Sequence, residues 1–502
     1  MTFTNPLFFL MFLPSVLVGF EFAGSFGRRT AIAFLSLASL LFYAKWSVKY
    51  LFLLIASIFV NFLFSLAIEK LADRQRAQNV ALAAGIGTNL AVLCYYKYLF
   101  PVLHFFTGMG ILNHQFGSAI LPLGISFFTF TQIAYLIDLK QGIAKREPLI
   151  NYSLFVTFFP HLIAGPIVHH EEMMPQFSAE RRYRLNSDDM AVGLTWFTMG
   201  FFKKVMIADL IAPQADAFFS RPHNVGASEA WIGLLTYSLQ LYFDFSGYSD
   251  MAVGLARMFS IRFPLNFNSP YKATNIIDFW QRWHITLTRY IMSYVYSPVL
   301  LWVNRRRLQA GKKVSRKATR TVEGFLSMVT LPTMFALFLA GVWHGAGFQF
   351  LVFGLMHGVF LVINHAWRTF LPEEGRARKL LVTPLGIALT YTCVLSAQVM
   401  FRASSFQDAI SIYGDLLGLH GAGAPWSLAQ VGLFAGLYSV IWLMPNTQEI
   451  LGEAREDEQP NWSIFRSVRW QPTWPWWVAT TAVFAASMFY SSANSTFLYF
   501  QF

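Results

Sequence analysis

The sequence predicts an all-α polytopic membrane protein with about 11–13 transmembrane or re-entrant helices. Of its 502 residues, 55% are apolar and only 13% are charged, about half the charged share of an ordinary soluble protein. That apolar content suffices for about a dozen bilayer crossings of ~20 residues each. Because no long polar stretch of globular composition interrupts the apolar segments, we expect a single integral membrane domain over residues 1–502.

The apolar segments follow one another along the whole chain, and each is long enough, or nearly so, to cross a bilayer. They lie around residues 7–24, 30–46, 48–68, 80–106, 119–139, 149–168, 190–219, 229–260, 322–343, 347–365, 380–401, 427–444 and 474–490. Pro160, Gly165 and Pro166 interrupt the run 157–168 (TFFPHLIAGPIV), so we expect a broken or re-entrant helix there. Irregular backbone at membrane depth needs surrounding protein or a water-filled cavity, which indicates a central polar cavity.

The net charge of +12 is typical of a membrane protein whose cytoplasmic loops carry excess Lys and Arg, so we do not expect nucleic acid as a partner. Residues 69–76, 140–147 and 305–320 are rich in basic side chains and should face the cytoplasm. The stretch 305–320 holds eight basic residues and no acid. We interpret it as a basic cytoplasmic loop that fixes topology; contact with anionic lipid headgroups or a negatively charged donor is the alternative.

Two histidines in apolar surroundings are the candidate catalytic residues. His344 lies in the stretch 340–347 (AGVWHGAG), and His284 lies in the stretch 278–290 (DFWQRWHITLTRY). We expect the second stretch to be one helix with a partly polar face formed by Ile277, Gln281, His284, Thr288 and Ile291. A neutral imidazole can take a proton from a hydroxyl; for either histidine alone, a structural hydrogen bond is the alternative.

Other ionisable groups have simpler interpretations. The cluster His169-His170-Glu171-Glu172 lacks HExxH spacing, so we predict an interfacial loop and no metal site. Asp244 and Asp250 either form a proton or ion path or pair with Arg257 or Arg262, and we favour structural pairing. Cys94 and Cys393 supply neither a disulfide framework nor a cysteine-rich metal site. Templates for soluble hydrolases, P-loop enzymes and dinucleotide-binding enzymes do not match.

Several stretches together resemble the membrane-bound O-acyltransferase (MBOAT) family, and most closely its bacterial branch that acetylates alginate or D-alanylates teichoic acid. These stretches are 40–46 (LLFYAKW), 121–138, 158–167, 242–284, 343–347 (WHGAG), 354–358 (GLMHG), 399–406 and 497–502 (FLYFQF). The resemblance implies helices arranged around a central tunnel. It also implies that His344 is the catalytic histidine and His284 a second active-site histidine. Residues expected to line or support the tunnel are Trp343, Gly345, Trp280, Gln281, Arg282 and Trp283.

By this resemblance, the reaction is acyl transfer, with acetyl as the expected group, and the protein lies in a bacterial inner membrane. A cytoplasmic thioester such as acetyl-CoA is the donor substrate, and no cofactor is bound. His344 would act as general base, while His284 would orient it or hydrogen-bond the carbonyl. The acceptor is an extracellular or periplasmic polysaccharide of open identity, and a periplasmic or secreted acyltransferase is an expected partner.

Two further expectations concern particular segments. The 24 residues from Arg320 to His344 would advance ~36 Å as a straight helix, more than the ~30 Å hydrocarbon core, so the helix should tilt or break at Pro332 or Gly341. The aromatic C-terminal motif 497–502 (FLYFQF) resembles an ending in which a tyrosine carries the acyl group onward. Tyr499 is therefore either an acyl relay or an interfacial aromatic anchor.

Two functions of other classes remain open from the sequence. A transporter or exporter component would move a glycan or a solute without covalent chemistry, and Asp244 and Asp250 would then serve its ion path. A scaffold that recruits a secreted transferase would bind a partner without consuming a donor. Replacement of His344 distinguishes them, because only the transferase requires a base at that position.

Overall fold

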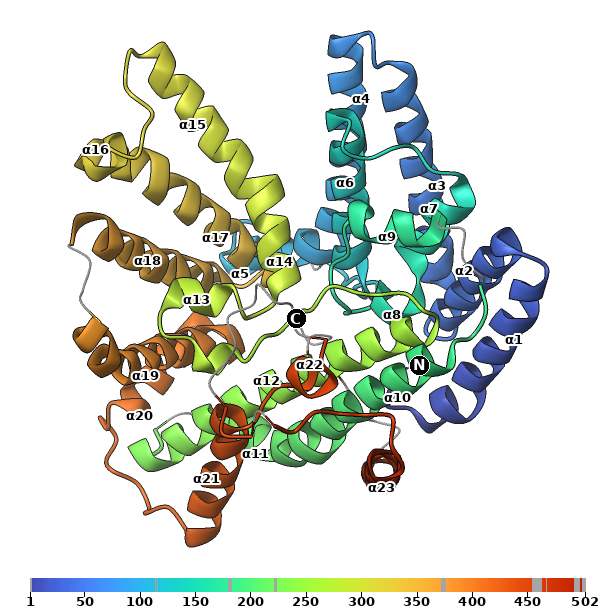
Figure 1. The fold of residues 1–502 in the computed structure, drawn as a ribbon. Coiled ribbons are helices and arrows are strands. Elements are labelled where there is room, and N and C mark those ends of the chain that lie inside the picture. Colours follow the sequence, from blue (N-terminus) through green and yellow to red (C-terminus); the bar gives the residue numbers. More distant parts are fainter. Residues whose placement is uncertain are drawn as a thin grey trace. The chain divides into compact units, whose positions relative to one another are not determined.

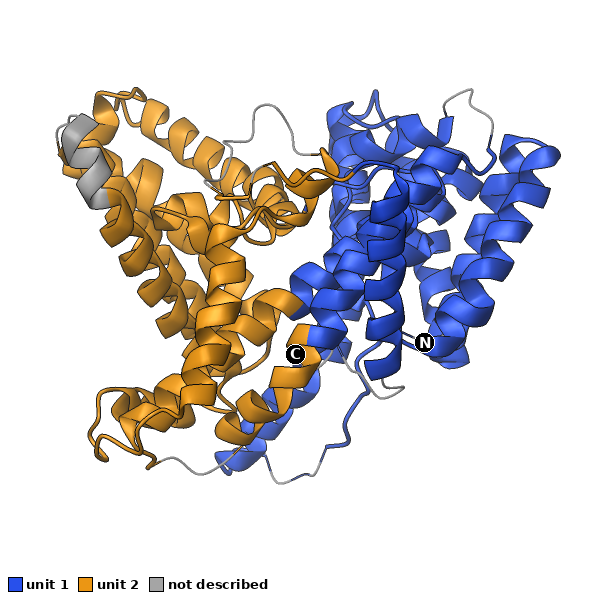
Figure 2. Cartoon of the chain, turned by 60° about the horizontal axis from the view of Figure 1, so that its bottom comes forward, with its two compact units in different colours: residues 1–206, 244–265, 471–501 blue, residues 207–243, 266–470, 502 orange. Residues whose placement is uncertain are grey.

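The structure, a computed structural model, describes residues 2–112, 114, 116–178, 183–220, 224–371, 376–453, 463–465, 467–491 and 497–498, without the side chains of residues 376–382. The described residues are helical apart from turns, connecting segments and an isolated antiparallel bridge between Phe267 and Trp283 (Figure 1). The predicted all-α class is confirmed. The chain forms two compact units, coloured in Figure 2: unit 1 comprises residues 1–206, 244–265 and 471–501, and unit 2 comprises residues 207–243, 266–470 and 502.

Unit 1 contains the N-terminal helices and the last helix of the chain. Its helices are α1 (Leu13–Ser25), α2 (Arg28–Ala44), α3 (Val48–Lys70), α4 (Gln75–Cys94), α5 (Phe100–Gly108), α6 (Ile125–Gln141), α7 (Leu149–Thr157), α8 (Phe159–Leu162), α9 (His170–Ser178), α10 (Ser187–Phe202) and α23 (Trp474–Tyr490). Short π-helical turns precede α1 at Phe8–Phe12, join α4 to α5 at Tyr95–Leu99 and follow α10 at Lys203–Ala208.

Local sequence explains where several of these helices begin and end. The Ser47 side chain accepts a hydrogen bond from the Tyr50 N–H and begins α3, and the Asn186 side chain does the same for the first turn of α10. Such side chains satisfy amide groups that lack a partner within the helix. Gly142 ends α6 in a left-handed conformation (φ 74°), which costs least for glycine.

The run 157–168 is interrupted as the sequence predicts. Helix α7 ends at Thr157, α8 covers only Phe159–Leu162, and the chain is irregular until α9 begins at His170. Pro160 lies in the first turn of α8, where its missing N–H does no harm. The expectation of an interfacial loop for the cluster His169-His170-Glu171-Glu172 is wrong for its last three residues, because they form the first turn of α9.

Unit 2 contains the helices that follow α10, except for α23 and the second half of α12. They are α11 (Asp209–Phe219), α13 (Ile276–Trp280), α14 (Ile285–Ile291), α15 (Ser297–Gln309), α16 (Val322–Phe325), α17 (Leu331–His344), α18 (Phe348–Phe370), α19 (Arg376–Arg402), α20 (Phe406–Leu416), α21 (Leu428–Leu443) and α22 (Thr447–Leu451). Shorter helical turns cover Pro270–Lys272, Met292–Tyr296, Ala318–Arg320 and Leu326–Thr330. The long helix α12 (Ala227–Met258) is continuous, with residues 227–243 in unit 2 and residues 244–258 in unit 1.

Seven helical segments are long and apolar enough to cross a membrane, judged by length and composition within the described residues. They are Phe8–Ser25, Val48–Lys70, Gln75–Gly108, Ser187–Phe219, Val322–His344, Phe348–Phe370 and Thr383–Arg402. Every other predicted apolar segment also contains a helix. Among these helices, α2, α6, α21 and α23 are 16 or 17 residues long. A multi-pass membrane protein is confirmed, and the total of about 11–13 crossings or re-entrant helices stays a prediction.

The buried carboxylates of α12 pair with lysines, while Arg257, one of the partners that we expect, pairs with Asp189. Lys204 Nζ lies 2.6 Å from Asp244 Oδ1, and both side chains are 3% exposed. Lys203 Nζ lies 2.6 Å from Asp250 Oδ2. The α10 and α12 backbones meet closely in unit 1, since a Cβ on Gly200 would lie 2.5 Å from the Gly247 carbonyl oxygen. This approach brings the lysines that follow α10 onto the carboxylate face of α12, so the structural interpretation holds with different partners.

The segment leading to His344 does not break at Gly341. Helix α16, the π-helical turn Leu326–Thr330 and α17 follow one another without interruption, and Pro332 lies in the first turn of α17. The segment therefore departs from a regular α-helix at the π turn Leu326–Thr330, just before Pro332. Proline has no backbone N–H to donate, and a π turn is one way in which a helix accommodates the missing hydrogen bond. Gly341 instead allows close packing, because a Cβ there would lie 2.4 Å from the Phe350 carbonyl oxygen of α18.

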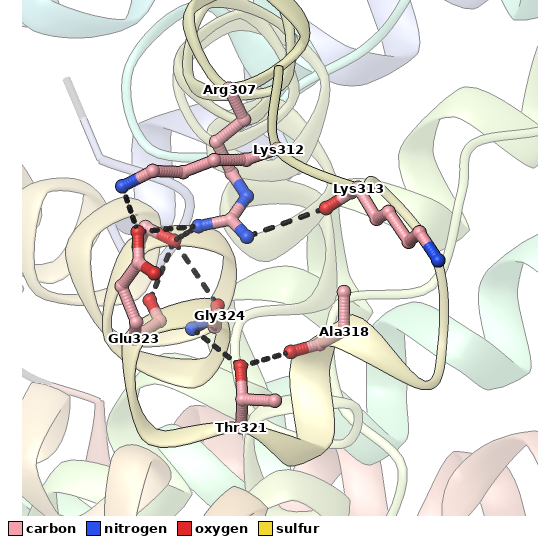
Figure 3. Close-up of polar contacts among 8 residues, drawn as sticks. Arg307, Lys312, Lys313, Ala318, Thr321, Glu323 and Gly324 are labelled. Atoms are coloured by element: carbon pink, nitrogen blue, oxygen red, sulfur yellow. Dashed lines mark hydrogen bonds and ion pairs between the residues drawn. The ribbon is translucent and has the colours of Figure 1, made fainter. Parts of the chain in front are cut away.

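The basic stretch 305–320 contains the end of α15 and the turn that joins α15 to α16, so that the two helices form a hairpin. Polar contacts hold this turn in place (Figure 3). Residues 305–309 extend α15, which corrects the predicted loop in that part. Arg307 is buried, donates to Ser327 Oγ at 2.8 Å and to the Lys313 carbonyl oxygen at 3.3 Å, and pairs with Glu323 at 3.4 Å. Lys312 also pairs with Glu323. The seven remaining basic side chains of the stretch are exposed, namely Arg305, Arg306, Lys312, Lys313, Arg316, Lys317 and Arg320.

Candidate functional site

His344 is the last residue of α17 and lies among aromatic side chains of unit 2. Its side chain is buried, and its ring centroid lies 5.6 Å from that of Phe353 and 5.0 Å from that of Phe401. Gly345 follows with an extended backbone. A Cβ at Gly345 would lie 2.2 Å from the Phe350 ring, so glycine is required there for the close approach of that ring. This is how Gly345 supports the site.

His284 lies at a helix boundary and not within the continuous helix that we expected. Helix α13 ends at Trp280, and His284 precedes α14 with a left-handed backbone (φ 45°, ψ 52°). The Ile285 N–H donates to the Asn266 carbonyl oxygen at 3.0 Å, and the Asn268 N–H donates to the Arg282 carbonyl oxygen at 2.9 Å. Pairing with this distant segment breaks the helix, so the predicted one-face arrangement of residues 277–291 is wrong. A non-glycine residue in this conformation is often found at functional sites.

Asn266 determines which nitrogen of His284 carries the proton. Its Oδ1 lies 2.9 Å from His284 Nδ1 and also receives hydrogen bonds from the Thr286 N–H and the Thr286 hydroxyl, at 3.4 Å and 2.9 Å. Because a backbone N–H can only donate, Oδ1 is the acceptor and Nδ1 of His284 carries the hydrogen. Burial lowers the pKa of His284 to about 3, which keeps the ring neutral and makes Nε2 its basic nitrogen.

Trp343 connects the two histidines. The indole centroid lies 6.3 Å from that of His284 and 4.7 Å from that of His344. The two imidazoles therefore belong to one aromatic-walled site within unit 2. The structure brings together the three residues His284, Trp343 and His344 as the sequence predicts, while their catalytic roles stay a prediction.

The other predicted supporting residues lie on the segment between α13 and His284. Trp280 is buried, and its Nε1–H donates to His357 Nδ1 at 3.3 Å. Arg282 pairs with Asp278 at 2.6 Å and donates to the Asn268 carbonyl oxygen, so it braces the loop. Gln281 is exposed. Trp283 stacks at 5.8 Å on Phe279 and at 6.1 Å on Tyr271.

Sequence reasoning missed two residues of this site, Asn266 and His357. Asn266 binds the His284 ring, and His357 binds the Trp280 indole. Both lie in stretches that carry the family resemblance, 242–284 and 354–358 (GLMHG). The family resemblance of these stretches marks them as functionally important. The spacing along the chain does not indicate that Asn266 hydrogen-bonds His284 or that His357 hydrogen-bonds Trp280.

The C-terminal motif is described only in its first two residues, and Tyr499 lies outside the described residues. Within unit 1, the Leu498 N–H donates to Asp244 Oδ2 at 3.0 Å. The Phe497 ring stacks on Tyr248 at 4.4 Å. The start of the motif is therefore bound by α12 through a buried carboxylate and an aromatic contact.

Comparison with known proteins gives the same identification as the motifs. Residues 140–322 match the MBOAT, membrane-bound O-acyltransferase family. The chain is 37% identical over 450 residues to a peptidoglycan O-acetyltransferase of Helicobacter pylori, covering 84% of this chain and 80% of that protein. It is 32% identical to a "Probable alginate O-acetylase" of Pseudomonas aeruginosa over 100% of both chains.

A more distant relative is a teichoic acid D-alanyltransferase of Bacillus subtilis, which is 27% identical over 59% of this chain and 72% of that protein. The similarity to the Helicobacter pylori protein, 37% identity over 80% of its length, extends well beyond residues 140–322, which match the family. The chain therefore belongs to the membrane-bound O-acyltransferase family and is a multi-pass membrane O-acyltransferase.

Proposed function

We propose that this acyltransferase moves an acetyl group from a cytoplasmic thioester, acetyl-CoA or a similar donor, to a hydroxyl of an extracellular or periplasmic polysaccharide. The observation that carries the proposal is the buried pair of imidazoles, His284 and His344, which both contact Trp343. The relatives named for O-acetylation of peptidoglycan and of alginate support acetyl as the group and a glycan as the acceptor.

His344 acts as the general base in this proposal. It takes the proton from the attacking hydroxyl, whose oxygen forms a bond to the thioester carbonyl carbon. The tetrahedral intermediate then collapses, the carbon–sulfur bond breaks, and the proton held by His344 passes to the departing thiolate. The aromatic walls formed by Phe353 and Phe401 exclude water that would hydrolyse the donor.

His284 contributes a hydrogen-bond acceptor. With Nδ1–H given to Asn266, the neutral ring presents a lone pair on Nε2. It accordingly accepts a hydrogen bond from the substrate or from His344, which favours the expected role of orienting His344 over the alternative of donating to the carbonyl oxygen. Its fixed tautomer keeps the geometry of the site constant through the reaction.

The exposed basic side chains of the α15–α16 hairpin bind the phosphates of the donor. Among the residues that the structure describes, Glu323 lies beside them and is already paired with Arg307 and Lys312, so it does not cancel the charge of the exposed basic side chains. The buried Arg307 holds the tip in a defined conformation (Figure 3), which reduces the ordering cost of binding a polyanion.

In the relay form of this proposal, Tyr499 supplies the attacking hydroxyl: its phenol oxygen bonds to the thioester carbonyl carbon, the carbon–sulfur bond breaks, and the phenol proton leaves with the thiol. A periplasmic or secreted acyltransferase then moves the acyl group from this ester to a hydroxyl of the polymer, which returns the proton to Tyr499. An acyl carrier needs a fixed attachment, and the hydrogen bond from the Leu498 N–H to the buried Asp244 supplies one for the residue that precedes Tyr499. Tyr499→Phe should abolish acylation of the polymer while membrane insertion remains intact. Wild-type polymer acylation in that variant would instead identify Tyr499 as an aromatic anchor.

The main test follows label from acetyl-CoA in the purified protein in detergent, and counts as transfer its appearance either on the protein itself or on added glycan fragments of the cell envelope. His344→Ala should lose transfer, and the matched variant of the exposed His104, His104→Ala, should keep it. Retained transfer in His344→Ala would overturn the proposed mechanism. Movement of a glycan or solute by reconstituted protein without any acyl donor would support a transporter.

A further inference from the structure

His357 is a buried histidine of α18 whose ring is held on several sides. It is 3% exposed, and its Nδ1 accepts the Nε1–H of Trp280 at 3.3 Å. An indole N–H can only donate, so Nδ1 of His357 is unprotonated and its Nε2 carries the hydrogen. The ring lies parallel to Phe279 at 6.3 Å and edge-on to Phe353 at 4.8 Å.

These contacts join the two segments that carry the active-site histidines, α13 with the loop before His284 and α18 packed on α17. Trp280 is the last residue of α13, and the chain reaches His284 four residues later. On the other side, α18 packs directly on α17, where a Cβ on Gly354 would lie 2.3 Å from the Leu337 carbonyl oxygen. Phe353 contacts both His357 and His344, at 4.8 Å and 5.6 Å.

The left-handed backbone at His284 makes this support necessary. A histidine at φ 45° is held by its surroundings and not by its own preference. Asn266 fixes the ring of His284 from one side. The Trp280–His357 hydrogen bond attaches the end of α13 to α18. The loop that leads to His284 starts at this end of α13, and α18 packs against α17, which carries His344.

We propose that His357 is a positioning residue for acyl transfer: its hydrogen bond with Trp280 holds α13 against α18 and so sets the placement of His284 relative to His344. The inference rests on the proposed function, since it takes His344 and His284 as the reacting pair. His357 does not touch the substrate in this proposal. Its effect should therefore appear in the rate of the chemical step and not in donor binding.

The test uses variants that separate the hydrogen bond from the volume of the side chain. His357→Leu keeps the bulk and removes the acceptor, whereas His357→Asn places Oδ1 where Nδ1 lies and keeps the acceptor. For His357→Leu we expect kcat to fall about tenfold or more with KM for acetyl-CoA unchanged, because a buried indole N–H is left without its acceptor. His357→Asn should restore kcat to within about threefold of the wild-type value.

Trp280→Phe removes the donor by a second route and remains informative if His357→Leu does not fold. If the hydrogen bond is the cause, kcat in the double variant Trp280→Phe/His357→Leu should be no lower than in the worse single variant. The matched control is His365→Leu, a half-buried histidine on the same helix, which should keep kcat within about twofold.

The outcomes separate this inference from the proposed function. Wild-type kcat in His357→Leu, or a loss in His357→Leu that His357→Asn does not restore, overturns the positioning role while loss of transfer in His344→Ala still stands. Retained transfer in His344→Ala overturns the proposed function and removes the basis of the inference with it.

Discussion

Nδ1 of His284 lies 2.9 Å from Oδ1 of Asn266, and the backbone of His284 is left-handed at that point. The two residues are 18 positions apart, so a tertiary contact fixes both the tautomer and the orientation of the ring. The hydrogen bond that one ring nitrogen makes decides which nitrogen of a histidine carries the proton. The first prediction follows from this pair.

Asn266→Leu should lower kcat for acetyl transfer about tenfold or more, because the Nδ1–H of His284 loses a buried acceptor, a loss of about 1–3 kcal/mol. Asn266→Asp keeps an acceptor oxygen at the same place and should retain more activity, with a raised His284 pKa from the added negative charge. Steady-state kinetics over a pH series check both variants. Equal kcat in Asn266→Leu and wild type would contradict a role for this hydrogen bond.

The depressed pKa of His284 predicts a pH dependence of stability. Burial lowers this pKa from 6.5 to about 3, so as pH falls below about 6.5 the unfolded chain takes up a proton that the folded chain refuses. Stability that is fully present above that pH is lost as pH falls toward 3, and the loss at pH 5.5 is about 1.4 kcal/mol.

The variant His284→Asn isolates this contribution, because asparagine tolerates the left-handed backbone and does not titrate. Thermal unfolding in detergent at pH 7.5 and pH 5.5 should show a smaller loss of stability in His284→Asn than in wild type. Other histidines contribute equally to both proteins. The same pH dependence in both would show that His284 takes up its proton in the folded state as readily as in the unfolded state.

The buried pair Lys204–Asp244 should matter far more than an exposed pair. Its side chains are 3% exposed, and removal of one partner from such a pair costs about 3–5 kcal/mol. Lys204→Met should therefore lower the melting temperature strongly. Glu69→Gln, which breaks the more exposed pair with Arg146 (33% and 48% side-chain exposure), should cost at most about 1 kcal/mol.

The double variant Lys204→Met/Asp244→Leu should recover part of the stability lost in Lys204→Met, because no charge is left buried alone. Recovery will be incomplete, since the Leu498 N–H also loses its acceptor on Asp244. Thermal shift measurements in detergent check the series. A similar small effect of Lys204→Met and Glu69→Gln would contradict a buried pair.

Gly341→Ala should destabilise the packing of α17 on α18. The added Cβ would lie 2.4 Å from the Phe350 carbonyl oxygen, so the helices must shift, at a cost of about 1–3 kcal/mol. Gly87→Ala is the control on α4, where a Cβ meets nothing within 4 Å and where alanine favours the helix. Melting temperatures should fall only for Gly341→Ala, together with its transferase activity, because α17 carries His344.

The charge of the α15–α16 hairpin should affect the donor and not the acceptor. Replacing the exposed Arg316, Lys317 and Arg320 by Gln should raise KM for acetyl-CoA several-fold, more at low than at high salt. The charge-matched control replaces Lys70, Arg74 and Arg76, which are also exposed, and should leave this KM unchanged. An assay in neutral detergent excludes anionic lipid as the cause, and equal KM in both triple variants would reject the hairpin as the phosphate site.

Much of the fold follows from local sequence. Runs of apolar residues predict the helices, and each predicted segment contains at least one. The interruption at Pro160 is also confirmed, because proline acts on its own turn whatever lies around it. The motif stretches are likewise local, and they sufficed to identify the family.

Two predictions failed because contacts with distant parts of the chain decided the outcome. The segment 277–291 was expected to keep one helical face, but the backbone of residues 266–268 competes for its hydrogen bonds. Sequence proximity predicts an arginine partner for Asp244, but the close approach of Gly200 and Gly247 brings Lys204 to this carboxylate. In both cases the deciding group comes from a distant part of the chain.

The sequence alone determined the membrane class, the helical segments, the family and the two candidate histidines, because apolar runs, prolines and short motifs act over a few residues. Only the tertiary structure decided that Trp343 contacts His284, that Asn266 sets the tautomer of His284 and that His357 accepts from Trp280. Each of these is a contact between side chains that spacing along the chain cannot bring together. Their partners are chosen by how the helices pack.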